Sequence, residues 1–216
     1  MTKLKAVLFD LDGTLLYTLP DIHLCLNRTL EAHGYAPCTA SQTRSYIGGG
    51  VRQLLERAVG KDAQDLDALC TEYGALYPLH AQDHVEFYPG IPELVEALRG
   101  RGLLTGVVTN KPHAAAVAMI ERFCGKSMDV TIGKREGCPA KPAPDSLLEA
   151  VEALGLAPEE VLYVGDAPVD AETARNGALP CVLVSWGYSD REVLEGCEAL
   201  ALIDAPAALL SLFPEN

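Results

Sequence analysis

The sequence predicts an α/β fold in which a Rossmann-like parallel sheet, flanked by helices, is interrupted by an inserted α-helical domain. Short apolar runs end in polar turns, as buried parallel strands do. Amphipathic stretches that end at glycine separate these runs. Residues 16–88 break the alternation, because they carry apolar residues at helical spacing and no strand pattern.

The first expected strand covers residues 4–9 and ends at the turn that begins with Asp10. Runs of the same design predict three further strands and a shorter one, over residues 103–108, 161–164, 180–184 and 130–132. Helices are expected between them, over residues 93–99, 113–123 and 145–154. Alternating strands and helices are typical of a parallel sheet covered on both faces.

The inserted segment divides the sheet domain in sequence. Apolar residues such as Ile22, Leu26 and Leu30 recur at helical spacing within it. Pro89-Gly90 marks the return to the sheet. We therefore expect a discontinuous core domain of residues 1–15 and 89–216, and a helical domain of residues 16–88.

Composition limits the partners and the compartment. A chain of 216 residues with a formal net charge of -13 repels polyanions, so nucleic acid and anionic membrane surfaces are not expected partners. Seven scattered cysteines without a C-x-x-C pair are typical of reduced thiols. With no signal sequence and no membrane-spanning stretch, we expect a cytoplasmic protein, either monomer or homodimer.

Polar residues follow the expected strands, where ligands bind in open parallel sheets. The set comprises Asp10, Asp12, Thr109, Lys141, Asp166 and Asp170. Three carboxylates near one point need a cation to stay ionised, and Mg²⁺ takes oxygen ligands. Asp10, Asp12 and Asp166 are the candidates for the negatively charged side of such a cation site.

The same residues suit phosphoryl transfer. An aspartate can attack phosphorus and form a covalent intermediate, while a second acid moves protons. Mg²⁺, Lys141, the Thr109 hydroxyl and backbone N–H groups near Asp12 and Asn110 would hold the phosphoryl oxygens. No other cofactor is required.

Four segments, in order, resemble the motifs of the haloacid dehalogenase-like superfamily. The first is Phe9-Asp10-Leu11-Asp12-Gly13-Thr14-Leu15. Thr109 in Val-Val-Thr-Asn-Lys resembles the second, Lys141 in Lys-Pro-Ala-Pro the third, and Gly165-Asp166 with Asp170 the fourth. The resemblance extends over nearly the whole chain.

This resemblance implies roles for the residues. Asp10 would be the nucleophile and Asp12 the general acid and base. Magnesium would be held by the Asp10 side chain, the Asp12 backbone carbonyl and Asp166, while Asp170 would orient Lys141 or a metal-bound water. The helical domain would be the small cap that closes over the site and contacts the leaving group.

A narrower resemblance concerns the substrate. Leu19-Pro20-Asp21, Tyr46-Ile47-Gly48-Gly49-Gly50 and Thr109-Asn110-Lys111-Pro112 are similar to phosphoglycolate phosphatases. This implies an enzyme that hydrolyses a small-molecule phosphate ester through an aspartyl-phosphate, with 2-phosphoglycolate as the best candidate. Gly49 and Arg52 are candidate substrate contacts, since an arginine binds a carboxylate bidentately, although most arginines on helices are solvated.

Other activities stay open at this point. A phosphomutase resembling β-phosphoglucomutase, a pyrophosphatase and a nucleotidase share the four motifs. Asp12 and Gly13-Thr14 argue against a carbon–halogen hydrolase. A receiver-like phospho-acceptor domain would have no helical insert.

Overall fold

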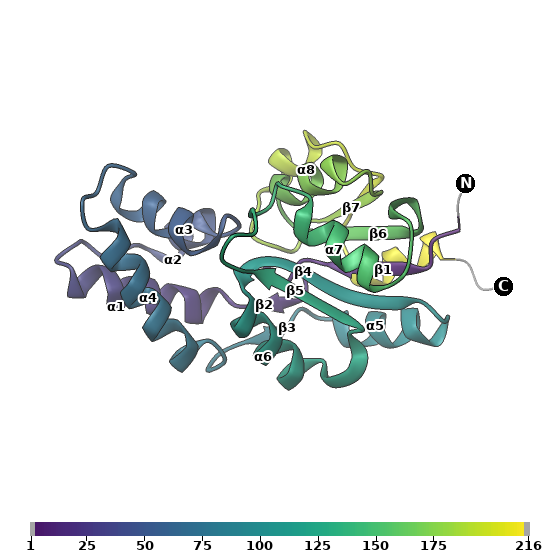
Figure 1. The fold of residues 1–216 in the computed structure, drawn as a ribbon, viewed down its shortest axis with the longest axis horizontal. Helices are drawn as coiled ribbons and strands as arrows, with labels where there is room; N and C mark the ends of the chain where they lie inside the picture. The colour runs from purple at the N-terminus through teal and green to yellow at the C-terminus, as the bar shows by residue number, and fades with distance from the viewer. Residues whose placement is uncertain (1–2, 214–216) are drawn as a thin grey trace.

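The structure, a computed structural model, describes residues 3–213 and confirms the predicted α/β fold (Figure 1). Its main sheet has six parallel strands in the order β5-β4-β1-β6-β7-β8. In chain order they are β1 (Ala6–Phe9), β4 (Leu104–Pro112), β5 (Val130–Lys134), β6 (Val161–Gly165), β7 (Cys181–Val184) and β8 (Ala201–Ile203).

The strand order reverses around β1. Its neighbours are β4 on one side and β6 on the other, so the chain builds one half of the sheet and then crosses to the other half. In such sheets the crevice beyond the carboxyl ends of the strands is where ligands bind. Asp10, the residue that follows β1, therefore stands at the topological switch point.

Helices cover both faces of the sheet, as the apolar strands require. Val7 and Phe9 of β1 belong to the core that includes α5 (Ile91–Gly100) and α6 (His113–Phe123). Ala6 and Leu8 belong to a second core with α7 (Asp145–Ala153) and α8 (Pro168–Asn176). Figure 1 shows these two helix pairs on opposite sides of the strands.

Four further helices lie together beyond one end of the sheet, at the left of Figure 1. They are α1 (Leu19–Ala32), α2 (Ala40–Tyr46), α3 (Gly50–Val59) and α4 (Leu66–His80). We call this group the cap. Helix α2 begins with a capping box, because the Thr39 hydroxyl accepts from Gln42 N at 3.2 Å and Gln42 Oε1 accepts from Thr39 N at 2.8 Å.

One expectation about the insert is wrong. Residues 16–88 contain strand at both ends, where β2 (Leu16–Tyr17) pairs antiparallel with β3 (Glu86–Phe87). Two-residue strands are too short to show an alternating pattern in sequence. This ribbon holds together the two chain segments that connect the cap to the sheet.

The remaining elements are short. They are α9 (Arg191–Glu195) and three 3₁₀ turns over Gly125–Ser127, Pro158–Glu160 and Pro206–Leu212. Within residues 3–213, no helix has the length and apolar character needed to cross a bilayer.

Candidate active site

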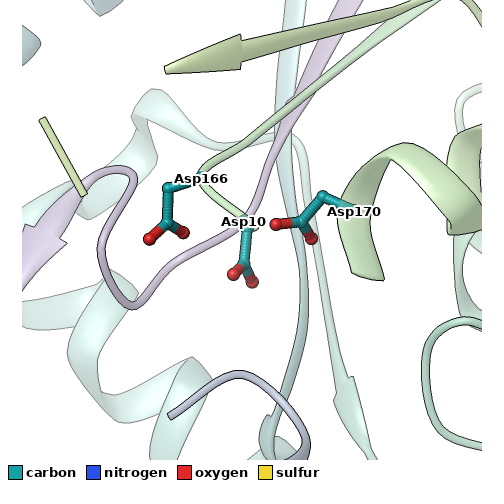
Figure 2. A group of neighbouring side chains, drawn as sticks. All are labelled: Asp10, Asp166 and Asp170. Atoms are coloured by element: carbon teal, nitrogen blue, oxygen red, sulfur yellow. The ribbon is translucent and has the colours of Figure 1, made fainter. Parts of the chain in front are cut away.

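The site is built around three aspartates that adjacent elements bring together. Asp10 follows β1, Asp166 follows β6, and Asp170 lies in the first turn of α8. One carboxylate oxygen from each lies within 4.8 Å of those of the other two. Figure 2 shows Asp10 between Asp166 and Asp170.

Asp166 is fixed by two hydrogen bonds. Its Oδ1 accepts from the Thr14 hydroxyl at 3.1 Å, and its Oδ2 accepts from the backbone N–H of Tyr188 at 2.7 Å. Gly13 makes this possible, because its φ is +86° and a Cβ there would overlap the Asp166 carboxylate. The loop after β1 thus packs directly against the acid after β6.

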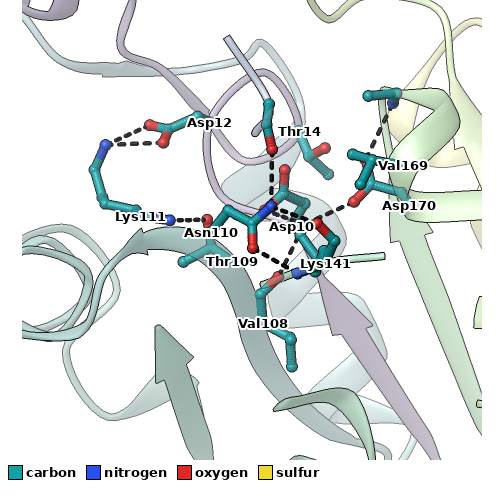
Figure 3. A network of polar contacts seen from close by, with 12 residues as sticks. Asp10, Asp12, Thr14, Val108, Thr109, Asn110, Lys111, Lys141, Val169 and Asp170 are labelled. Atoms are coloured by element: carbon teal, nitrogen blue, oxygen red, sulfur yellow. Dashed lines mark hydrogen bonds and ion pairs between the residues drawn. The ribbon is translucent and has the colours of Figure 1, made fainter. Parts of the chain in front are cut away.

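Lys141 joins Asp10 to Asp170 (Figure 3). Its Nζ lies 2.9 Å from Asp10 Oδ1 and 2.7 Å from Asp170 Oδ1. Lys141 Nζ also donates to the Tyr163 hydroxyl at 2.9 Å, which in turn donates to the carbonyl of Val108 at 2.9 Å. Burial disfavours the lysine charge, but Asp10 and Asp170 outweigh it and hold the pKa of Lys141 well above its usual value.

The acids carry more negative charge than Lys141 balances. Burial raises the pKa of Asp10 to about 6, although Lys141 acts in the opposite direction. Burial, with Asp170 and Asp10 nearby, also raises the pKa of Asp166 well above its usual value. Carboxylate oxygens suit a hard divalent cation, which would relieve the repulsion between the neighbouring carboxylates. Asp10 and Asp166 could hold such a cation, while Asp170 is engaged with Lys141.

Asp12 has partners that the sequence reasoning missed. Lys111 Nζ donates to both of its carboxylate oxygens at 2.8 Å, and the Thr18 hydroxyl donates to Oδ1 at 2.6 Å. Lys111 stands beside Thr109 in the polar end of β4, so its position was a visible signal in the sequence. The carboxylate of Asp12 is therefore held in one orientation beside Asp10.

Asn110 connects the core to the cap. Its Oδ1 accepts from the backbone N–H of Lys141 at 2.8 Å, and its Nδ2 donates to the carbonyl of Gly48 at 3.0 Å. Thr109 is buried, lines the same cavity, and accepts from the backbone N–H of Lys111 at 3.2 Å. This segment thus supplies both a hydroxyl-bearing residue that lines the cavity and a contact to the cap.

A cavity of about 250 Å³ lies between the cap and these residues. Asp10, Asp12, Thr109, Asn110 and Asp166 line its core side. The cap wall is mostly apolar and comprises Ile22, Ile47, Val51, Leu54, Tyr73 and Tyr77, with Arg44 and Ser45. The shape and charge of this cap wall depend on how the cap helices pack against one another. The spacing of residues in the sequence does not predict that packing.

Three candidate substrate contacts, Lys141, Gly49 and Arg52, do not line this cavity. Lys141 is buried behind it against Asp10 and Asp170. A Cβ at Gly49 would overlap the Gln53 side chain, and its neighbours Gly48 and Gly50 line the cavity instead. Arg52 is exposed and pairs with Asp67 on the next cap helix. Arg44, which the sequence reasoning did not select, is the cap arginine that reaches the cavity.

The chain is similar over most of its length to several known proteins. Residues 7–184 match the model of the haloacid dehalogenase-like hydrolases. The chain is 36% identical to a phosphoglycolate phosphatase of Rhodospirillum rubrum, covering 95% of this chain and 89% of that one. It is 34% identical to an N-acetylmuramic acid 6-phosphate phosphatase of Pseudomonas aeruginosa, covering 97% and 95%.

The fold has close counterparts among solved structures. One is a protein of Lactobacillus delbrueckii subsp. bulgaricus provisionally assigned as a phosphoglycolate phosphatase. The two share 29% sequence identity and superpose with a TM-score of 0.91 over 98% of this chain and 99% of the other. The similarity therefore includes the cap as well as the sheet.

Proposed function

The chain belongs to the haloacid dehalogenase-like hydrolase family, and on that premise we propose that it hydrolyses a small phosphomonoester through an aspartyl-phosphate on Asp10. It is a phosphoric monoester hydrolase, as its family and its phosphatase relatives establish. The observation that carries the proposal is the position of Asp10. Its carboxylate lies 2.9 Å from Lys141 Nζ and faces a cavity that Asp12 also lines.

In the first step, an oxygen of Asp10 attacks phosphorus while the bond from phosphorus to the leaving oxygen breaks. Asp12 donates a proton to that leaving oxygen. In the second step, Asp12 takes a proton from water, the water oxygen bonds to phosphorus, and the bond to Asp10 breaks. Lys141 and the Thr109 hydroxyl hold the phosphoryl oxygens.

Magnesium fits the donor set. Asp10, Asp166 and the backbone carbonyl of Asp12 would hold it, and it would supply positive charge against the phosphoryl oxygens. Asp170 binds Lys141 at 2.7 Å, so we assign it the role of positioning that lysine. Lys111 holds the Asp12 carboxylate where it can exchange a proton with the leaving group.

We propose 2-phosphoglycolate as the substrate. Several relatives, from Rhodospirillum rubrum to Aquifex aeolicus, are phosphoglycolate phosphatases. The cavity of about 250 Å³ lies below the volumes of roughly 300–1,000 Å³ common for larger ligands, which favours a small leaving group. N-acetylmuramic acid 6-phosphate is the second candidate, because a relative that covers 97% of this chain acts on it.

The proposal is tested by phosphate release from 2-phosphoglycolate, N-acetylmuramic acid 6-phosphate and glucose 1-phosphate, with Mg²⁺ and with EDTA. Asp10→Asn is the test variant, since an amide cannot act as the nucleophile. Asp62→Asn, at an exposed position, is the matched control. We expect Mg²⁺-dependent release by wild type and by the control, and none above background by Asp10→Asn.

Two results would reject the proposal. Full turnover by Asp10→Asn would exclude the aspartyl-phosphate. Conversion of glucose 1-phosphate to an isomer without phosphate release would identify a phosphomutase instead.

A further inference from the structure

Arg44 projects from the last turn of α2 into the cavity between cap and core. Its Nη2 donates to the carbonyl of Gly187 at 3.2 Å, and its Nη1 lies 3.7 Å from Asp190 Oδ1. Gly187 and Asp190 lie in the core, between β7 and α9. Arg44 therefore reaches from the cap to the core beside the space that a leaving group would occupy.

The charges around the cavity set Arg44 apart. Arg44 and Lys111 are the two cationic side chains among the described residues that line it. Lys111 is bound to both oxygens of Asp12. The acidic partner of Arg44 is Asp190, whose side chain is 75% exposed, at the longer distance of 3.7 Å. Exposed ion pairs contribute little, so Arg44 can exchange Asp190 for another anion at low cost.

The position of Arg44 is held from two sides. Arg57 Nη1, on α3, donates to the carbonyl of Tyr46 at 3.0 Å. Asn110 of the core donates to the carbonyl of Gly48. The segment that follows Arg44 is thus anchored to the next cap helix and to the core side of the cavity, which holds the backbone next to Arg44 in place.

We infer that Arg44 binds a carboxylate on the leaving group and selects phosphate esters of small hydroxy acids. This inference rests on the proposed phosphatase activity and adds to it the residue that recognises the acid. A guanidinium offers paired N–H donors that match a carboxylate. Most of the cap wall is apolar, with residues such as Val51 and Leu54, and these side chains offer no partners for the hydroxyls of a sugar.

The test uses a pair of substrates that differ in the carboxylate. Phosphate release is measured from 2-phosphoglycolate and from ethyl phosphate, in which a methyl group replaces the carboxylate. The variants are Arg44→Gln, Arg44→Lys, Arg52→Gln and Asp190→Asn. Arg28→Gln, an exposed cap arginine that does not line the cavity, is the matched control.

We expect Arg44→Gln to lower kcat/KM for 2-phosphoglycolate roughly 10- to 100-fold, the loss of a charged hydrogen-bonded contact. Its rate on ethyl phosphate should stay close to that of wild type. Arg44→Lys should recover part of the preference for the acid, because it keeps the charge without the paired donors. Asp190→Asn should lower KM for 2-phosphoglycolate, since it removes the competing anion, and Arg28→Gln should leave both rates unchanged.

Three outcomes would overturn the inference. An equal loss on both substrates in Arg44→Gln would show that Arg44 only supports the cap. If Arg52→Gln rather than Arg44→Gln lost the preference for 2-phosphoglycolate over ethyl phosphate, Arg52 would be the residue that contacts the carboxylate. Equal rates of wild type on the two substrates would exclude recognition of the acid while leaving the phosphatase in place. Failure of wild type on both, and on p-nitrophenyl phosphate, would reject the proposed function itself.

Discussion

Lys111 Nζ lies 2.8 Å from both carboxylate oxygens of Asp12, and the same nitrogen is 4.8 Å from the centre of the Tyr77 ring. Tyr77 belongs to cap helix α4, whereas Asp12 and Lys111 belong to the core. Asp12, the proposed acid and base, is therefore held by a lysine that also contacts the cap. This arrangement makes the orientation of Asp12 depend on the cap being in place.

Lys111→Met tests this link. The substitution keeps most of the length of the side chain and removes the charge that holds Asp12. We expect kcat for 2-phosphoglycolate to fall roughly 10- to 100-fold, the effect of a misplaced catalytic group, with a smaller change in KM. Steady-state kinetics of wild type and Lys111→Met provide the measurement. Lys126→Met, at an exposed position, is the control, and an unchanged kcat in Lys111→Met would show that Asp12 needs no such support.

Asp12→Asn separates the two proton transfers. Nitrophenolate leaves without a proton, whereas the alkoxide of an aliphatic ester needs one. We therefore expect Asp12→Asn to lower kcat for 2-phosphoglycolate roughly 10²- to 10⁴-fold. With p-nitrophenyl phosphate it should release a burst of about one equivalent of nitrophenolate and then turn over slowly. Stopped-flow absorbance measures the burst, and a linear trace at the wild-type rate would exclude Asp12 as the base.

We expect Asp166 and Asp170 to differ in role although both lie beside Asp10. Asp166→Asn should raise the Mg²⁺ concentration for half-maximal activity at least about tenfold, since it loses a charged ligand. Asp170→Asn should leave that concentration nearly unchanged and destabilise the fold by about 3 kcal/mol, because buried Lys141 loses a partner. Mg²⁺ titration and denaturant unfolding distinguish them. An equal rise in the Mg²⁺ requirement would make Asp170 a ligand.

The core side of the site could be predicted because its signals are local in sequence. Asp10 follows an apolar strand, and the ends of parallel strands converge whatever the details of packing. Lys141 was predicted on its motif, but its pairing with Tyr163 was not, since Tyr163 reads as an ordinary apolar position of β6. The two-residue strands β2 and β3 were missed because they are too short to show a period.

The substrate half could not be predicted in the same way. Arg44 and Arg52 both stand on cap helices near the glycine-rich turn, and either could reach a substrate by spacing alone. The packing of α2 and α3 directs Arg44 to the cavity and Arg52 to Asp67. Which arginine faces the core depends on contacts between helices and on the loop at Asp190, distant in sequence.

The raised pKa of Asp10 predicts how stability changes with pH in the absence of metal. Burial raises this pKa from 3.8 to about 6. Between these two pH values the folded chain keeps a proton on Asp10 that the unfolded chain has lost. This proton stabilises the folded state. The stabilisation is complete below pH 3.8 and is lost as pH rises through about 6. Asp166 acts in the same direction.

We therefore expect the protein in EDTA to have a higher Tm near pH 5 than near pH 7.5. Mg²⁺ at the higher pH should restore Tm, because it binds the folded state. Asp10→Asn should raise Tm near pH 7.5 by at least about 2 °C, the shift that roughly 1 kcal/mol produces in a chain of this size, and should flatten the pH dependence. Differential scanning fluorimetry measures each Tm. Asp62→Asn makes the same change in net charge at the surface, so an equal rise in that variant would assign the effect to overall charge rather than to the buried acid.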